Sequence, residues 1–413
     1  MTLGYTMTTN QVFYCSDSEY YARAENCISK ALNERRITQD DKKIISKYLL
    51  EKNAAGISPA RHLKLASNLV LLREYHPPYL ECTTEDVLEA FNNLRFAKRK
   101  PTRNEKVDES SLPRMKQNTV SDKQRILKYM FVWVAENRIN PNLDLVKLSK
   151  MKPVSVDYNT VKEADLLTEE ELLGFFRACL TPRDRAMFHV MYEGALRVGD
   201  IGNLQFKDLE INEKYCRIIT TQKTGKKRIV PLQSSRVYLT QWLNVYPKQN
   251  PSPEDFVFLN AWNRPISHGA ITSQTNKIGQ RAGIQKKLHP HLFRHTRITM
   301  LSRSGLDEAK IKMLAWGNQS TDMMKTYNHL TVSDLDEALA ELNGIETPKK
   351  KQKSLLKPIQ CPKCGTINPA GHSYCETCNK PLTEKAEQDL EALGKELLER
   401  LTKNPGALIE MFK

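Results

Sequence analysis

Apolar residues recur at helical spacing through the first 150 positions of the chain. Helix-start signals precede three of these stretches: Thr38 has Asp41 three residues later, Ser58 is followed by Pro59, and Thr83 stands before a third apolar period. A serine or threonine before an apolar period, or a proline at the first helical position, begins a helix. The expected helical segments cover residues 44–50, 62–75, 85–96 and 118–139. They predict a small helical bundle.

Residues 97–117 interrupt this pattern. The stretch is charged and nearly free of apolar side chains, so it cannot fill a core. We expect a mobile basic loop between two helices of the bundle, suited to lie along a polyanion such as DNA.

The pattern after residue 166 is mixed. Thr168 and Glu171 form a capping box before one helix, and a second helix leads into Arg197. Residues 215–221 and 227–232 are then β-rich and flank a turn at Gly225, which predicts a hairpin. Helical periods return at residues 235–246, 269–283, 291–304, 307–316 and 334–344. The prediction is a mainly helical α+β domain with one small antiparallel sheet.

These shifts in pattern and composition divide the chain into seven segments. We expect an N-terminal arm at 1–15, a helical domain at 16–150, a linker at 151–165, the mixed domain at 166–345, a basic linker at 346–358, a four-cysteine module at 359–383 and a C-terminal helical segment at 384–413.

Composition adds a partner class. The 413 residues are too many for one ordinary core, and 63 Lys and Arg against 48 Asp and Glu give a formal charge of +15 and a pI near 9.3. A positive field favours a polyanion, most simply nucleic acid, over a generally basic soluble protein. We find no run of 18 apolar residues and no signal peptide at the N-terminus, so the expected location is the cytoplasm, with no membrane partner.

Two positions in the mixed domain suit phosphate binding. Arg197 is followed three residues later by Asp200, which could hold the guanidinium while its fork binds two phosphate oxygens. Lys223 stands at the predicted hairpin turn. By itself each has an ordinary explanation, since such an Arg-Asp pair is commonly a surface ion pair and turn lysines are commonly solvated.

The segment HPHLFRHTR carries a denser cluster. His291 and Arg294 are three residues apart, so they share a helical face, and Pro290 marks the start of that helix. The positive end of a helix beside both side chains suits an anion. A metal site or a polar helix cap is the alternative, but no carboxylate or cysteine is close in sequence. Further on, Tyr327 in MMKTYNHLT could equally be a packing residue.

The order GALRVGD, KTGKKRIVPL, HPHLFRH and a tyrosine before NHL resembles the tyrosine recombinase family, also called phage-type integrases. The resemblance is close over residues 166–335, and the bundle at 16–150 looks like the family's SAM-like core-binding domain. It implies a site-specific recombinase that breaks and rejoins double-stranded DNA in dimers or tetramers, without nucleotide or catalytic metal. The expected location is then a prokaryotic nucleoid.

The resemblance also implies roles. Arg197 and Arg294 would clamp the scissile phosphate, Lys223 would protonate the leaving 5′ oxygen, and His291 would assist proton transfer. Tyr327 would attack and form a 3′-phosphotyrosyl link. Asp200 would support Arg197.

One position departs from the family pattern. Nine residues before Tyr327, where the family has His or Trp, this chain has Asn318, while Trp316 is the better chemical match. We expect Trp316 to fill the position; the alternative is that it only packs.

Four cysteines, Cys361, Cys364, Cys375 and Cys378, form two C-x-x-C pairs near the C-terminus. Such knuckles are typical of a zinc ribbon, in which structural zinc stabilises a module too small for its own core. A redox dithiol or two disulfides are the alternatives. Similar ribbons follow the catalytic domain in archaeal-type integrases.

A leucine stripe closes the chain. Leu390, Leu393, Leu397 and Leu401 lie at helical spacing and need a partner, which could be the chain's own catalytic domain or a second subunit. Two rivals to the recombinase hypothesis remain: a non-catalytic DNA-binding regulator, favoured only by Asn318, and a type IB topoisomerase.

Overall fold

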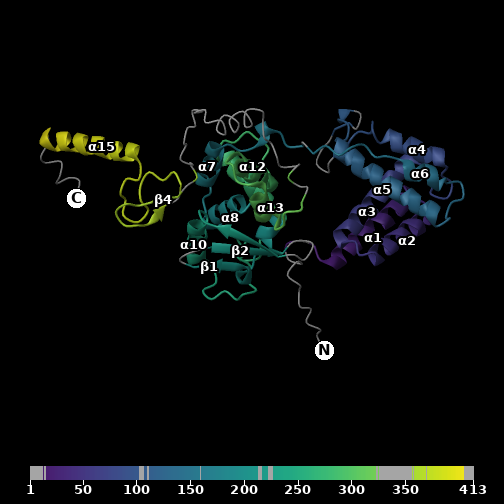
Figure 1. The fold of residues 1–413 in the computed structure, drawn as a ribbon, viewed down its shortest axis with the longest axis horizontal. Coiled ribbons are helices and arrows are strands. Elements are labelled where there is room, and N and C mark those ends of the chain that lie inside the picture. The colour runs from purple at the N-terminus through teal and green to yellow at the C-terminus, as the bar shows by residue number, and fades with distance from the viewer. Residues whose placement is uncertain are drawn as a thin grey trace. The chain divides into compact units, whose positions relative to one another are not determined.

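The computed structural model divides into two compact units, residues 1–160 and 161–413, which we describe separately (Figure 1). The residues it describes are 13, 15–101, 107–108, 111–158, 160–212, 216–221, 227–321, 324, 356, 358–368 and 370–403.

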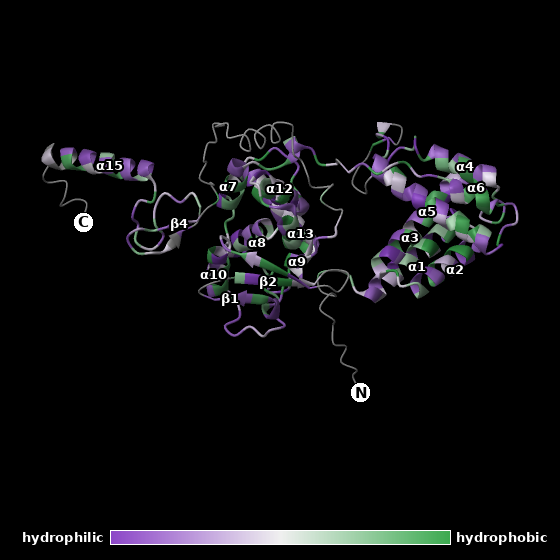
Figure 2. Ribbon diagram, in the orientation of Figure 1, coloured by the Kyte–Doolittle hydropathy of each residue, from purple (hydrophilic) through white to green (hydrophobic). Residues whose placement is uncertain are grey.

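The first unit is a bundle of helices around one apolar core. Its elements are α1 (Asp17–Asn33), α2 (Gln39–Ala54), α3 (Pro59–Leu72), α4 (Thr84–Asn93), α5 (Gln117–Glu136) and α6 (Leu145–Lys150). Helix α3 packs against α1, α2 and α5, and α5 also packs against α4 and α6. Apolar and hydrophilic bands alternate along these helices in Figure 2. Their apolar faces meet in a continuous buried cluster that includes Phe131 and Tyr79.

Side-chain caps begin three of these helices where the sequence indicated. Thr38 accepts a hydrogen bond from the backbone N–H of Asp41, and Asp41 accepts one from the N–H of Thr38. Ser58 caps α3 ahead of Pro59, and Thr83 caps α4. Each cap satisfies donors that the first turn leaves without a helical acceptor.

The charged loop differs in part from expectation, because its two ends are structured. The N–H of Arg99 donates to Pro113 O and the N–H of Met115 donates to Ala97 O, each at 3.0 Å. Leu112, one of the few apolar residues in the stretch, is buried. The centre of the loop, residues 102–106 and 109–110, lies outside the described residues.

The second unit begins with a domain of helices and one small sheet. Its helices are α7 (Glu169–Arg177), α8 (Pro182–Glu193), α9 (Val198–Gly202), α10 (Arg236–Asn244), α11 (His268–Arg281), α12 (Pro290–Arg303) and α13 (Glu308–Trp316). The strands β1 (Leu209–Ile211), β2 (Cys216–Thr221) and β3 (Lys227–Leu232) form an antiparallel sheet in the order β1-β2-β3. The hairpin was predicted; β1, with three residues, is too short to show a period.

Helix α12 organises this domain. It packs against α8, α11 and α13, while α13 packs against β3. These contacts bring the sheet, the end of α8 and the first turns of α12 to one place.

A small module and a helix follow. Strands β4 (Ile359–Gln360) and β5 (Ile367–Asn368) pair antiparallel, and α15 (Glu384–Lys403) is the C-terminal helix (yellow in Figure 1). The leucines of its stripe at 390, 393 and 397 are exposed. The predicted helix at 334–344 and most of the basic linker fall outside the described residues. Within the described part of the chain, no helix has the length and apolar character needed to span a membrane.

Candidate active site

The bend between α8 and α9 places Arg197. Helix α8 ends with Gly194, and Ala195 takes a left-handed backbone with φ of 45° while the N–H of Leu196 donates to Met191 O. This is the helix-ending arrangement that usually has glycine at the left-handed position. The bend leaves Arg197 as the first residue before α9, half-buried.

Asp200 supports this bend through the backbone. Its Oδ2 accepts a hydrogen bond from the N–H of Arg197 at 2.9 Å and another from the Nη2 of Arg228 at 2.9 Å. The sequence suggested that Asp200 holds the guanidinium of Arg197. In the structure the carboxylate instead fixes the backbone of Arg197 and pairs with a different arginine.

Helix α12 supplies the next two residues from its first turns. Pro290 occupies the first helical position, as expected. Arg294 is fully buried, and its two terminal nitrogens donate to Ala195 O and, at 2.8 Å, to Ala315 O. Its guanidinium also lies over the ring of Trp316, 5.0 Å from the centroid. Arg294 thus joins the bend before Arg197 to the end of α13.

His291 shares the first turns of α12 with Arg294. The side chain of His291 is partly exposed to solvent, but neighbouring protein atoms still desolvate its ring. That desolvation, followed by the charges of Arg294, His289 and Arg197, lowers the pKa of His291 below its ordinary value. The imidazole is therefore neutral near pH 7 and can accept a proton.

Trp316 and Asn318 occupy different surroundings. Trp316 ends α13 and is buried in a small cluster with Ala195, Ile298 and Ile311. Asn318 follows Gly317, which has φ of 67°; its Oδ1 is buried with no hydrogen-bond partner within the described part of the chain. Which of the two faces a phosphate stays a prediction.

Two of the candidate residues lie outside the described ranges. Lys223 belongs to the segment between β2 and β3, as does Gly225, and Tyr327 follows the last described position of the catalytic domain, Met324. Their roles stay predictions.

The site also contains a residue that the sequence analysis missed. Arg228 in β3 is buried with 2% of its surface exposed, and it pairs with Asp200. A signal was present in KRIVPL: Arg228 alternates in phase with Val230 and Leu232, the inward positions of the strand.

The four cysteines of the C-terminal module lie together. Their Sγ atoms are all within 4.8 Å of one another, and the pairs Cys361–Cys378 and Cys364–Cys375 are 3.6 Å apart. Tetrahedral thiolates about 2.3 Å from a zinc ion would be roughly 3.8 Å apart, so the spacing fits a metal. Cys364 Sγ lies 3.2 Å from Thr366 Oγ1, and hydrogen bonding with the side chain and backbone of Thr366 lowers the pKa of the Cys364 thiol.

The segment between the two cysteine pairs contacts the catalytic domain. The N–H of Ala370 donates to the hydroxyl of Tyr238 in α10 at 2.9 Å, and Arg177 of α7 donates to Gly371 O. The side chain of Gln241 reaches Glu376 at 3.2 Å. The module is thereby fixed to the α7 and α10 surface.

Comparison with known proteins agrees with this fold and site. A model of the phage integrase family matches residues 165–334. The tyrosine recombinase XerC of Haemophilus ducreyi is 31% identical over 172 residues, 41% of this chain and 54% of the relative. XerC of Histophilus somni is 30% identical over 234 residues, 56% of this chain and 74% of the relative.

Two solved structures share the fold. A lambda integrase dimer bound to a COC′ core site gives a TM-score of 0.51 at 13% identity, covering 70% of this chain and 94% of that one. XerH bound to palindromic difH substrate, a post-cleavage complex, gives 0.50 at 16% identity, covering 79% and 96%.

The mainly helical domain with its small antiparallel sheet is thus the tyrosine recombinase fold. The chain belongs to the phage integrase family of tyrosine recombinases. It spans about half the length of the first relative, 54%.

Proposed function

We propose that this protein is a site-specific recombinase that cleaves and rejoins DNA through a 3′-phosphotyrosyl intermediate on Tyr327, without ATP or catalytic metal. The observation that carries the proposal is the meeting of Arg197, His291 and Arg294. His291 and Arg294 both come from the first turns of α12, and Arg294 donates to Ala195 O, two residues before Arg197 at the start of α9.

The two arginines would stabilise the phosphate in the transition state. A guanidinium fork donates two parallel hydrogen bonds to non-bridging oxygens, and such fixed donors are strongest in a water-poor site. Arg294 is pre-organised, because the carbonyls of Ala195 and Ala315 and the ring of Trp316 hold it in place. We assign Trp316 this supporting role beside the clamp.

Proton transfer would then proceed through two side chains. The phenol of Tyr327 has an ordinary pKa near 10, so it needs a base, and a neutral His291 can accept its proton as the oxygen attacks phosphorus. The bond from phosphorus to the 5′ oxygen breaks, and Lys223 donates the proton that the leaving oxygen takes. The bond energy stays in the phosphotyrosyl link and allows rejoining.

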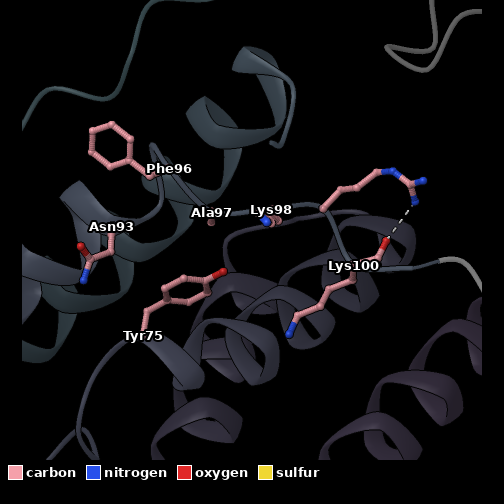
Figure 3. Close-up of a pocket in the computed structure, with 7 residues that line it drawn as sticks. Tyr75, Asn93, Phe96, Ala97, Lys98 and Lys100 are labelled. Atoms are coloured by element: carbon pink, nitrogen blue, oxygen red, sulfur yellow. Dashed lines mark hydrogen bonds between the residues drawn. The ribbon is translucent and has the colours of Figure 1, made fainter. Parts of the chain in front are cut away.

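The helical unit offers a basic surface for the DNA backbone. A groove of about 380 Å³ is lined by Lys98, Arg99 and Lys100 together with Tyr75 and Phe96. Figure 3 draws the residues that line it. An adjacent groove is lined by Arg99, Lys100, Asn68, Thr119 and Lys123.

The second groove contains a lysine, Lys123, whose charged form is disfavoured by its surroundings. Burial lowers the pKa of Lys123; Glu74 opposes the shift and Lys100 adds to it. A backbone phosphate would offset this repulsion, which supports DNA as the occupant.

We propose that the four cysteines hold a structural zinc ion. All four positions would be filled by protein thiolates, so the ion would supply folding stability to the module and no open coordination position. The relationship to archaeal-type integrases depends on this ribbon and stays a prediction.

We also propose assembly on DNA. Solved relatives include a lambda integrase dimer bound to a core site and a tetramer bound to a Holliday junction. Exchange between two duplexes needs several subunits, so this chain would act as a dimer or tetramer on double-stranded DNA. Its proposed location is the nucleoid, in the cytoplasm.

The test uses a nicked suicide substrate that carries a recombination site for this protein. The full chain should form a denaturation-resistant protein–DNA adduct, and Tyr327→Phe should abolish it. The matched control is Tyr158→Phe, which changes an exposed tyrosine in the other unit and should leave the adduct unchanged.

Other outcomes point to the rivals. DNA binding without any adduct in the wild type would support a non-catalytic regulator. An adduct that survives in Tyr327→Phe would show that the nucleophile is wrong. Relaxation of supercoils without site preference would support a topoisomerase.

A further inference from the structure

Arg228 is a buried charge that shares an acceptor with the proposed phosphate clamp, Arg197 and Arg294. Its side chain lies on the inward face of β3 and is 1% exposed. The Nη1 of Arg228 donates to the backbone oxygen of Ala315 near the end of α13, and the same oxygen accepts from the Nη2 of Arg294 at 2.8 Å. One carbonyl therefore holds Arg228 and one clamp arginine together.

The other side of the Arg228 guanidinium leads to the second clamp arginine. Its Nη2 donates to Asp200 Oδ2 at 2.9 Å, and that same oxygen accepts the N–H of Arg197 at 2.9 Å. A carboxylate oxygen has lone pairs for two donors, so both bonds form at once. This oxygen therefore fixes the backbone of Arg197 relative to Arg228.

These contacts close into a ring. Arg294 also donates to Ala195 O, and Ala195 lies two residues before Arg197 in the bend that follows α8. The ring passes through both clamp arginines and returns to its start by way of six residues: Arg197, Asp200, Arg228, Ala315, Arg294 and Ala195. Contacts that support a site from behind hold its side chains in one geometry, and a ring constrains both arginines at once.

Stability alone explains this buried charge poorly. A buried ion pair is in general no more stabilising than apolar side chains of similar volume, and a buried guanidinium is costly unless its donors are paired. Two further contacts complete the pairing of Arg228: its Nε donates to Thr220 Oγ1 at 3.1 Å, and its Nη1 also donates to Leu314 O at 3.1 Å. Lysine has one nitrogen, so it could not reach acceptors in all these directions.

We infer that Arg228 is a positioning residue for the proposed phosphate clamp: it holds Asp200 and the Ala315 carbonyl in place so that Arg197 and Arg294 meet the same phosphate. The inference rests on the proposed function. Arg228 is buried and acts through its neighbours, without touching DNA. Its loss should leave both clamp arginines present but misplaced, which weakens the stabilisation of charge on the non-bridging oxygens.

The test compares two scissile groups in Arg228→Lys. One nicked suicide substrate carries the normal phosphodiester. The other carries a methylphosphonate, in which a methyl group replaces one non-bridging oxygen and removes the negative charge. A neutral group needs less stabilisation from fixed cations in the transition state. The rate of adduct formation by the full chain, divided by the wild-type rate on the same substrate, measures how far each reaction depends on the clamp.

We expect Arg228→Lys to form the adduct roughly 100-fold more slowly than wild type on the phosphodiester, as for a misplacement of about 1 Å. On the methylphosphonate the loss should be no more than about tenfold, because the charge that the clamp stabilises is absent. DNA affinity on an uncleaved duplex should stay within about threefold of wild type, since many backbone phosphates contribute to binding.

Two further variants separate positioning from loss of folding. Thr220→Val removes the Nε acceptor alone, so it should give a smaller loss that is again greater on the phosphodiester, even if Arg228→Lys folds poorly. Ile218→Val is the matched control, because it shortens a buried side chain on the same face of β2 that makes no part of the ring. It should change the two rates by the same factor.

Three outcomes overturn the inference. Thr220→Val, or an Arg228→Lys with the circular dichroism of wild type, loses both substrates by the same factor; both variants cleave the phosphodiester like wild type; or Ile218→Val shows the same preference as Thr220→Val. A purely structural role predicts no dependence on the scissile group. A wild type that forms no adduct on the phosphodiester overturns the proposed function instead, and the inference with it.

Discussion

The core of the helical unit and the centre of the catalytic domain are both buried, but different side chains fill them. The first is a continuous apolar cluster from α1 to α6. The second contains two fully buried arginines, Arg228 and Arg294, which both donate to backbone carbonyls, and Arg228 donates also to a hydroxyl and a carboxylate. Apolar packing tolerates many partners of similar size, whereas a buried guanidinium requires acceptors in fixed directions.

The helical unit also contains a buried polar group, the carboxylate of Asp41, which can be compared with the buried arginines. Asp41 is buried and accepts from Thr38, from the N–H of Tyr79 and from Arg73. This group joins the start of α2 to residues up to 38 positions away in sequence. The arginines of the catalytic domain instead join elements up to 99 residues apart in sequence.

The largest expected loss of stability comes from a substitution in the apolar core of the helical unit, and it tests whether the two regions differ. Phe131→Ala removes a fully buried ring that contacts His76 and Tyr79, and it should cost about 3–5 kcal/mol. Hydrogen exchange should accelerate in α1 to α6 and stay unchanged in α7 to α13.

The matched change is Phe293→Ala, also fully buried but in the catalytic domain. Hydrogen exchange should then accelerate in α7 to α13 and stay unchanged in α1 to α6. Equal loss of protection in both units after either change would show that they unfold together and that the comparison is false.

An effect of intermediate size concerns the contribution of Asp41 to the free energy of unfolding and its dependence on pH. Burial would raise its pKa, but hydrogen bonds from Thr38, Tyr79 and Arg73 outweigh it and lower the pKa below the ordinary value. The unfolded chain therefore binds this proton more readily, so the stabilisation is complete above about pH 4 and is lost as the pH falls through the lower folded value.

Asp41→Asn should lower the free energy of unfolding at pH 7 by about 1–3 kcal/mol and flatten its decline below pH 4. Urea unfolding of the full chain between pH 3 and 7, followed by the fluorescence of Trp133, measures both. Asp122→Asn, at a surface ion pair with Lys64, should change stability by less than about 1 kcal/mol. A larger loss for Asp122 would contradict the assignment.

The smallest effect is at the ribbon. Tyr238→Phe removes the acceptor for the Ala370 N–H and should cost about 1 kcal/mol of docking. Exchange at residues 370–376 should accelerate a few-fold, and chelation of the proposed zinc ion should remove protection there altogether. Tyr246→Phe, whose hydroxyl donates to Phe256 O, serves as the control and should leave the ribbon unchanged.

Much of the local structure could be predicted from short patterns. The caps at Thr38, Ser58, Thr83 and Thr168 form as expected, because each depends on residues within three positions. The hairpin followed from alternation. Strand β1 could not be predicted, since three residues carry no period and only pairing with β2 defines it.

The candidate site divides in the same way. Resemblance of motifs selected Arg197, His291 and Arg294; in the structure Arg294 contacts Ala195 in the bend before Arg197 and shares α12 with His291. It could not select Arg228, although an arginine in phase with apolar strand residues was a visible signal. The acceptors that make this arginine stable lie on three other elements.

The sequence by itself determined most of the longer helices, the β hairpin and the residue types that can handle a phosphate. These properties depend on neighbours a few residues apart. Only the tertiary structure decided that Asp200 pairs with Arg228 and that Ala315 O serves both Arg228 and Arg294. The reason is physical: a buried charge is stable only where distant elements converge to satisfy it, and no local pattern records that convergence.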